Sequence, residues 1–380
     1  ILAQVMSDAI LHPLEDIARL DEERANFEQL GDFDSVIECT IQQLALWKVL
    51  YGLDEASVEQ LVEAHLRLSK AYAAGKYRQQ AAEHAKRGRI LLERVFDDGV
   101  SCRLTAQVLA AEALALMESP DSPDTGNQSV SVARVADLLK QALRATQEAF
   151  GEQDLRVAEI LENQGVVATS QQQYAVALGK ISEAWEIREA AVGKDNEQTL
   201  KLNIQMAHVH SLAGEIQDAL RLQEAAVARL RALDRFPALL IAAAQRLAEW
   251  QEQVGQDHDA LETLEVAEKV VVDNCGLDDP RAAKAKRDIA LLHLKLGDHQ
   301  AALKYLADVE YLERRLHGAS SLAVGRTLKA LGTVYMVSSN VAEAENCFVG
   351  ALAIFESHQK TQVVEEIKAK LHHLEVLKGH

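Results

Sequence analysis

The feature that most constrains this chain is a set of small residues that recurs at a nearly constant spacing. Five alanines follow one another at intervals of 42, 41, 42 and 42 residues. A small or short apolar residue follows each of them seven positions later, and another small residue precedes each by twelve. Coupled spacings of this kind predict a repeated structural unit rather than one large core. We call these five residues the anchors: Ala177, Ala219, Ala260, Ala302 and Ala344.

Each repeat is predicted to be a hairpin of two helices, helix A and then helix B, with the anchor in helix B. Hydrophobic residues make up 48% of the 380 residues, yet aromatics are only 4% and prolines number five, a composition that favours helix. Small residues let two helices approach closely, while larger apolar neighbours fill the remaining space. The pattern predicts helix A over 281–296 and helix B over 297–318, which bury their apolar faces together.

The repeat extends towards the N-terminus with one irregular step. Ala81 and Val135 continue the anchor series, but they are 54 residues apart, which is 12 more than one repeat. The polar, turn-forming stretch ESPDSPDTGNQS has this length and predicts a loop insertion. A weaker copy over 14–51 places Val36 at the anchor. We therefore predict about eight hairpins in an array over 1–357, a polar loop at 118–129, and a C-terminal capping helix over 358–380.

The small-residue spacing resembles that of tetratricopeptide repeats, in which a tyrosine or polar residue follows three positions after the first small one, as Tyr72, His293 and Tyr335 do. The 42-residue period resembles the kinesin-light-chain class, and segments 63–95 and 324–356 are similar to ciliary members of this superfamily. The resemblance covers about residues 14–357. It implies an all-α solenoid, a right-handed superhelix that holds partners in its concave groove and has no catalytic activity.

The residues themselves indicate no catalytic or metal chemistry. The sequence contains no GxxxxGK[ST], HExxH or GxSxG motif. His208 and His210 are two positions apart and point away from each other on a helix. The four cysteines show no CxxC spacing, so we expect reduced and mostly buried thiols. We predict a non-enzymatic protein with no cofactor and no metal.

The charge of the chain excludes some classes of partner. The net charge of −18 argues against binding to nucleic acid or to membrane phosphates. The apolar runs are too short to span a bilayer, and the first residues lack the basic flank of a signal peptide. We therefore expect a cytoplasmic protein without membrane insertion, and the resemblance further implies association with a cilium, a flagellum or the cytoskeleton.

The resemblance also places a candidate binding site, because helix A lines the concave surface in this superfamily. The groove-facing positions then lie 18, 15, 14 and 11 residues before each anchor. Basic residues gather at these positions in the last repeats, although the chain is acidic. Arginine suits carboxylates because its planar fork donates two parallel hydrogen bonds, and Asn163 and Gln205 share a register that could bind a peptide backbone. The predicted groove residues are Arg67, Lys70, Asn163, Lys201, Gln205, Arg246, Lys284, Arg287, Arg326 and Lys329.

We expect this groove to bind an acidic or C-terminal peptide segment of a protein partner. The alternative is that the bases pair with acids of neighbouring helices, such as Asp288 and Glu249. For the whole protein we predict a scaffold subunit of a ciliary or flagellar assembly. A motor–cargo adaptor like a kinesin light chain is the alternative, although these residues contain no sustained heptad run to bind the motor. A module that regulates an enzyme is a third possibility, and no oligomeric state is predicted.

Overall fold

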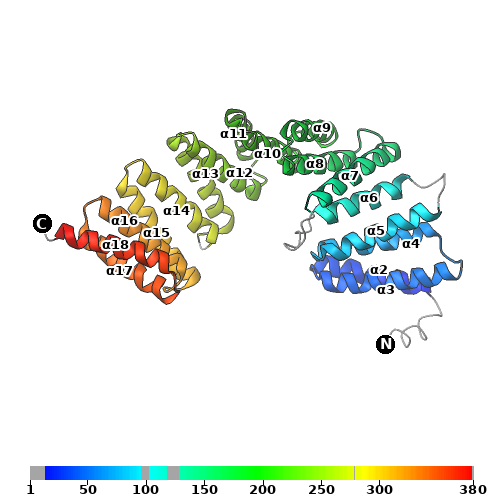
Figure 1. Ribbon diagram of the computed structural model, residues 1–380, viewed down its shortest axis with the longest axis horizontal. Coiled ribbons are helices and arrows are strands. Elements are labelled where there is room, and N and C mark those ends of the chain that lie inside the picture. The colour runs from blue at the N-terminus through cyan, green and yellow to red at the C-terminus, as the bar shows by residue number, and fades with distance from the viewer. Residues whose placement is uncertain (1–12, 96–101, 118–127, 278, 379–380) are drawn as a thin grey trace. The chain divides into compact units, whose positions relative to one another are not determined.

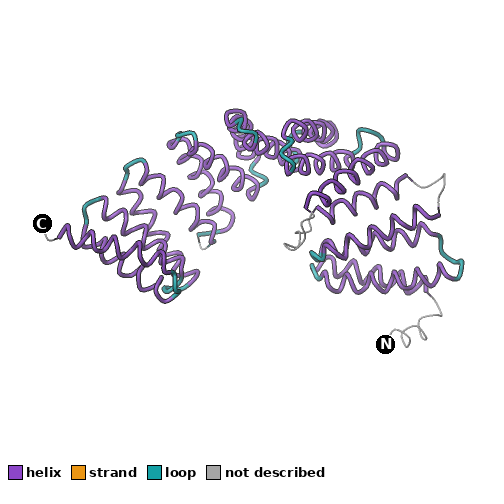
Figure 2. The backbone as a smooth tube through the Cα atoms, viewed as in Figure 1, coloured by secondary structure: helices purple, strands orange, loops and turns teal. Residues whose placement is uncertain are grey.

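The computed structural model describes residues 13–95, 102–117, 128–277 and 279–378. Within these residues it contains seventeen α-helices and no strand. Figures 1 and 2 show these helices joined by loops. The all-α prediction is therefore confirmed. The chain divides into two compact units, residues 1–213 and residues 214–380.

The first unit consists of helices that pack on their neighbours in chain order. The pairs α2/α3, α4/α5, α6/α7 and α8/α9 form four hairpins, and α10 packs on α9. The bounds are α2 Pro13–Leu30, α3 Phe33–Gly52, α4 Val58–Ala74, α5 Arg78–Val95, α6 Cys102–Met117, α7 Gln128–Phe150, α8 Leu155–Ser170, α9 Tyr174–Val192 and α10 Glu197–Leu212.

The second unit continues the same alternation. It begins with α11, the helix B that follows α10 in sequence, and then contains three hairpins, α12/α13, α14/α15 and α16/α17, closed by α18. The bounds are α11 Ile216–Leu233, α12 Pro237–Gln253, α13 Asp257–Cys275, α14 Pro280–Lys295, α15 His299–His317, α16 Leu322–Val337, α17 Val341–Ser357 and α18 Thr361–Lys378.

The small residues lie where two helices touch, as predicted. All five anchors are 0% exposed. A methyl group on Gly165 of α8 would lie 2.6 Å from Cγ1 of Ile181 on α9, and one on Gly332 of α16 would lie 2.9 Å from the Phe348 ring on α17. At these two positions the helices approach too closely for even a methyl group, and this explains the glycine at both.

Side-chain caps mark the start of most A helices. Asp154, Asn196, Asp279 and Ser321 each accept a hydrogen bond from a backbone N–H in the first turn of the helix that follows. These residues satisfy N–H groups that have no partner within the helix. Helix α12 begins with Pro237 and has no side-chain cap hydrogen bond. Proline suits this position because it has no N–H to satisfy.

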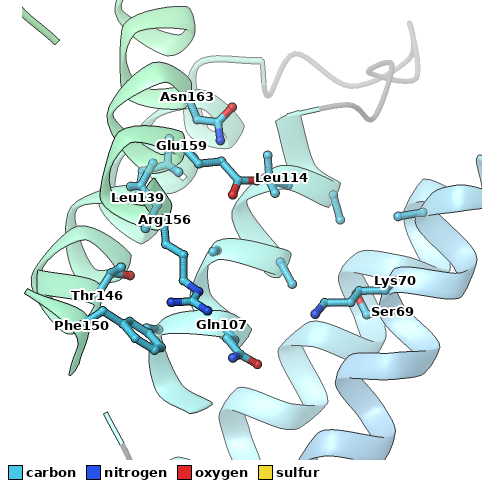
Figure 3. A pocket seen from close by; sticks show the side chains of 16 residues that line it. Ser69, Lys70, Gln107, Leu114, Leu139, Thr146, Phe150, Arg156, Glu159 and Asn163 are labelled. Atoms are coloured by element: carbon cyan, nitrogen blue, oxygen red, sulfur yellow. The ribbon is translucent and has the colours of Figure 1, made fainter. Parts of the chain in front are cut away.

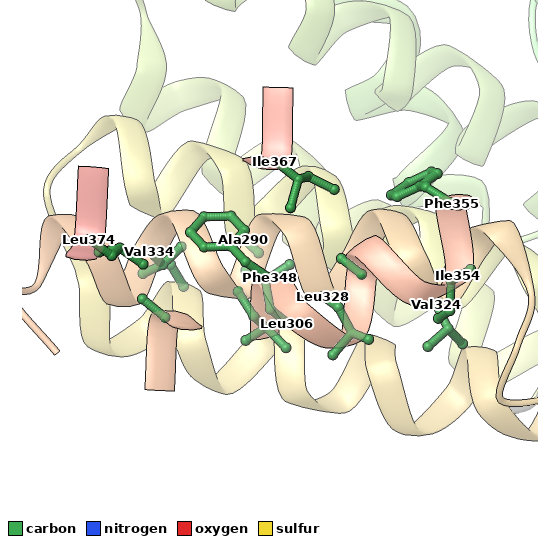
Figure 4. Close-up of a cluster of buried hydrophobic side chains, with 14 of the residues drawn as sticks. Ala290, Leu306, Val324, Leu328, Val334, Phe348, Ile354, Phe355, Ile367 and Leu374 are labelled. Atoms are coloured by element: carbon green, nitrogen blue, oxygen red, sulfur yellow. The ribbon is translucent and has the colours of Figure 1, made fainter. Parts of the chain in front are cut away.

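A hydrophobic cluster joins α14 to α18 at the end of the second unit (Figure 4). Phe348 of α17 is 0% exposed at its centre, and α18 adds Ile367 and Leu374 from the other side. Helix α18 therefore packs against the last hairpin, and the capping helix over 358–380 stays a prediction. The sequence predicted one continuous array over 1–357, whereas the structure divides into the two units given above. The single array therefore stays a prediction.

Three further predictions from the sequence have different outcomes. In the loop predicted at 118–129, residues 118–127 lie outside the described residues, and 128–129 already belong to α7. The expectation of mostly buried cysteines is wrong for Cys275, which is exposed as the last residue of α13, while Cys39 is buried. No helix among the described residues has the length and apolar character needed to cross a membrane.

Candidate partner-binding groove

A pocket in the second unit lies where the predicted groove positions of two A helices meet. It has a volume of about 200 Å³ and is lined by α14 and α16, with one residue from α15. Its floor is apolar, and two bases and one hydroxyl stand among the lining residues. Five of the nine lining residues occupy predicted groove-facing positions: Leu291, Arg326, Lys329, Ala330 and Thr333. The other four are Ala290, Leu294, Leu306 and Val334.

Two charged residues of α18, which the repeat register does not contain, contact residues that line this pocket. The Lys329 ammonium donates to Glu366 of α18 at 2.5 Å, and the Lys370 ammonium donates to the Thr333 hydroxyl at 2.9 Å. Burial lowers the pKa of Lys370, and the nearby charge of Lys329 adds to this effect. The hydrogen bond from Lys329 lowers the pKa of Glu366. Sequence reasoning missed both α18 residues because the register was followed only to the last helix pair.

Arg287 has a different role from the other predicted bases. Its guanidinium forms an ion pair with Glu313 on α15, a carboxylate that is 1% exposed and also accepts the Thr327 hydroxyl at 2.6 Å. Burial lowers the pKa of Arg287, and the charge of Arg326 lowers it further. Arg287 therefore neutralises a buried acid, and Arg326 is its exposed neighbour.

The remaining bases of the second unit are exposed. Among the described residues, Arg246, Lys284 and Arg326 form no ion pair within 4 Å. The acids proposed to neutralise them, Asp288 and Glu249, also have no such pair in the described part of the chain. Burial raises the pKa of Asp288, while the charges of Lys284 and Arg287 act in the opposite direction. Neighbouring helices do pair with two of the bases, Arg287 and Lys329, but through Glu313 and Glu366.

The first unit contains a larger pocket of about 480 Å³ between α4, α6, α7 and α8 (Figure 3). Lys70 and Asn163, both predicted groove residues, line it from opposite sides. Alanines of α6 make up much of its floor. Arg156, which lies outside the predicted register, stands over the Phe150 ring at 4.2 Å from its centroid. The two pockets therefore differ in character, since the first unit's pocket also contains the acid Glu159.

The other predicted groove residues of the first unit are held by neighbouring side chains. Arg67 pairs with Asp21 of α2 at 3.5 Å, and Lys201 pairs with Glu197 one turn earlier at 2.7 Å. The Gln205 amide donates to Glu162 of α8 at 2.8 Å. Asn163 thus lines a pocket, whereas the Gln205 amide is hydrogen-bonded to an acid. The two side chains therefore do not offer the same hydrogen-bonding groups to a peptide backbone.

Comparison with known proteins identifies the repeat. Residues 281–357 match the family model described as tetratricopeptide repeat. The C-terminal part of a tetratricopeptide repeat-containing protein from Cytophaga hutchinsonii is similar in fold, with a TM-score of 0.54 and 11% identity over 76% of this chain and 95% of that one. The apo form of RapI has a TM-score of 0.51 and 13% identity over 79% of this chain and 98% of that one.

A putative kinesin light chain repeat protein from Podosopora anserina has 16% identity over 58% of this chain and 99% of that one, at a TM-score of 0.45 that is too low to argue from. No curated protein sequence matches the chain significantly. The ciliary resemblance thus has no relative behind it and stays a prediction. Residues 281–357 thus match the tetratricopeptide-repeat family, and the chain shares its helical-hairpin fold with a solved protein that contains this repeat.

Proposed function

We propose that this protein is a non-enzymatic interaction scaffold whose second unit binds an acidic peptide segment of a protein partner. The fold is that of a protein-interaction scaffold. One observation locates the proposed binding site. An apolar pocket has Arg326 and Lys329 among its lining residues, although the net charge of the chain is −18.

The charges at this pocket favour an anionic segment. Arg326 is exposed and has no ion-pair partner among the described residues, so its planar fork is available to a carboxylate. In the part of the chain that the structure describes, the Lys329 ammonium pairs with Glu366 alone, and the Glu366 side chain is 49% exposed. Exposed ion pairs of this kind contribute about 0–1 kcal/mol, so a partner carboxylate could replace Glu366 at small cost.

The apolar lining gives the site a second element of recognition. Leu291 is 48% exposed beside the bases, and Leu294, Leu306 and Val334 lie in the lining with it. Burying one large apolar side chain contributes about 1.5–3 kcal/mol. A segment with an acid next to an apolar residue therefore suits this surface better than a purely acidic one.

A binding measurement with defined peptide pools tests the proposal. Fluorescent nine-residue pools, either rich in Asp and Glu, neutral, or rich in Lys, are titrated with the full chain and followed by anisotropy. We expect the acidic pool to bind best and its affinity to fall at least about tenfold in the double variant Arg326→Glu, Lys329→Glu. Equal binding of the three pools would overturn the proposal.

A matched control separates the site from net charge. Lys269 and Lys304 are exposed bases on the B helices α13 and α15 and lie outside the pocket lining. The variant Lys269→Glu, Lys304→Glu makes the same change in charge and should bind the acidic pool nearly as the original chain does. An equal loss in both variants would point to general charge rather than to the pocket.

We further propose a ciliary or flagellar assembly as the setting of this scaffold. The resemblance of segments 63–95 and 324–356 to ciliary members of the superfamily supports it, while the 42-residue period favours a motor–cargo adaptor as the alternative. Affinity capture from ciliated cells, compared between the pocket variant and its control, distinguishes them. Ciliary proteins lost only from the pocket variant support the scaffold, motor subunits support the adaptor, and an unchanged set contradicts both.

A further inference from the structure

Two cations line the pocket defined by α14 and α16, and a third, Lys370 of α18, contacts one of the lining residues. Arg326 and Lys329 line it together with Thr333. The Thr333 hydroxyl donates to the Lys329 carbonyl at 2.9 Å, which leaves its oxygen to accept from Lys370 of α18, also at 2.9 Å. The Lys370 ammonium lies 5.4 Å from the centroid of the Phe348 ring. Two helices thus hold Lys370 beside Lys329, and the charge of Lys329 helps lower the pKa of Lys370.

The donors of these three side chains are largely unused. An ammonium group has three N–H donors and a guanidinium has five. Among the described residues, Lys329 gives one to Glu366, Lys370 gives one to Thr333, and Arg326 gives none to an acid. Most of the donors therefore remain for a ligand with several acceptor oxygens.

The local charge exceeds what one carboxylate would neutralise. The charges of Arg287 and Glu313 cancel each other in an ion pair, and Glu366 offsets one of the three cations. Two positive charges remain. A phosphate monoester carries about −1.5 to −2 at pH 7 and presents three acceptor oxygens, so it matches this excess better than a carboxylate does.

We propose that the pocket recognises a phosphorylated serine or threonine in an otherwise flexible peptide, with the phosphate between Arg326, Lys329 and Lys370. A neighbouring apolar side chain of the peptide occupies the lining formed by Leu291, Leu294 and Leu306. The phosphate displaces Glu366 from Lys329. This inference rests on the proposed function and names the anionic group of its partner.

The test uses three degenerate nine-residue peptide libraries that differ only in a central phosphoserine, glutamate or serine. The best phosphoserine sequence is selected on the full chain, and its glutamate and serine forms are then measured by anisotropy. We expect the phosphopeptide to bind at least about tenfold more tightly than the glutamate form. Its affinity should fall between pH 7.5 and 5.5, because the second phosphate pKa is about 6, whereas the glutamate form should change little.

Variants locate the phosphate. Lys370→Ala and Arg326→Ala should each reduce the preference for phosphoserine over glutamate, while Glu366→Gln should strengthen phosphopeptide binding. The control Lys304→Ala should leave both values unchanged, and circular dichroism confirms that each variant is folded. Gain of affinity in Glu366→Gln is a result that a merely destabilised variant would not produce.

The outcomes separate this inference from the proposed function. Equal affinity for phosphoserine and glutamate peptides, both lost in the pocket variant, would overturn the phosphate specificity and leave the acidic-peptide function in place. Failure of all three libraries to bind would overturn both. A phosphoserine preference that persists in Lys370→Ala and Arg326→Ala would remove the phosphate from this pocket.

Discussion

The imidazoles of His65 and His84 face each other between α4 and α5, with their Nδ1 atoms 3.1 Å apart. His65 is 4% exposed, and the ring of His84 stacks on Tyr72. Burial lowers the pKa of each histidine to about 4, and the charges of Lys48 on α3 and Arg87 on α5 act in the same direction. Glu83 opposes this shift only at His84. The pair is therefore neutral in the folded protein at pH 7.

This pair predicts acid sensitivity in the second hairpin. In the unfolded chain the two histidines bind protons near pH 6.5, whereas in the folded chain they bind them only near pH 4. The free energy of unfolding should therefore fall as the pH drops from 6.5 to 4 and change little above pH 6.5. We expect a loss of about 2–3 kcal/mol, less than the full shifts suggest because His84 keeps some contact with solvent. Hydrogen exchange of α4 and α5 at pH 7 and pH 4.5 measures it.

Two substitutions check that the histidine pair is the cause. The variant His65→Gln, His84→Gln should flatten the pH dependence, whatever its stability at pH 7. The exposed His258 on α13 serves as the control, and His258→Gln should leave the dependence unchanged. A pH dependence that survives in the double variant would assign the effect to other groups.

The close helix contacts predict opposite effects of the same substitution at different glycines. Gly165→Ala and Gly332→Ala place a methyl group within 3.0 Å of a buried side chain and should each cost about 1–3 kcal/mol. Gly179→Ala, in α9 with nothing within 4 Å, should stabilise by about 0.5–1 kcal/mol. Denaturant unfolding compares the three. Destabilisation by Gly179→Ala as well would show that overpacking is not the reason.

The hairpin turns predict where glycine would stabilise the chain. Gln172 and Ser339 have φ values of 60° and 62° in the turns before α9 and α17, where the turn before α15 has Gly297 at 82°. A left-handed backbone costs about 1–2 kcal/mol for residues with a Cβ atom. Gln172→Gly and Ser339→Gly should therefore raise the melting temperature, and Gly297→Ala should lower it. Thermal unfolding followed by circular dichroism measures the three changes, and a fall in both glycine variants would contradict the prediction.

The buried acid Glu313 predicts that two adjacent arginines differ in their effect on stability. Arg287→Ala leaves this carboxylate without its ion-pair partner and should cost about 3–5 kcal/mol. Arg326→Ala removes an exposed side chain and should change stability by less than about 0.5 kcal/mol. Urea unfolding of both variants measures the difference. Equal losses of unfolding free energy in the two variants would show that the ion pair with Arg287 does not stabilise the buried Glu313.

The sequence alone determined the repeat and its helices. Positions such as Ala177 and Gly332 permit only small side chains, because two helix backbones approach there, and their spacing follows directly from the helical period. The same register brought Arg326, Lys329 and Thr333 to one pocket. The spacing of small residues depends on the geometry of one hairpin. Because the hairpin is repeated, the same spacing recurs several times in a single chain.

Only the tertiary structure decided which charged groups remain exposed. Arg287 and Arg326 occupy neighbouring places in the predicted groove, yet one is bound to a buried acid on the next helix and the other is not. Lys370 reaches Thr333 from α18, a helix outside the repeat register, and no signal in the sequence paired His65 with His84. Ion pairs between helices depend on side-chain conformation and on residues that differ from repeat to repeat, and the repeat spacing carries no information about either.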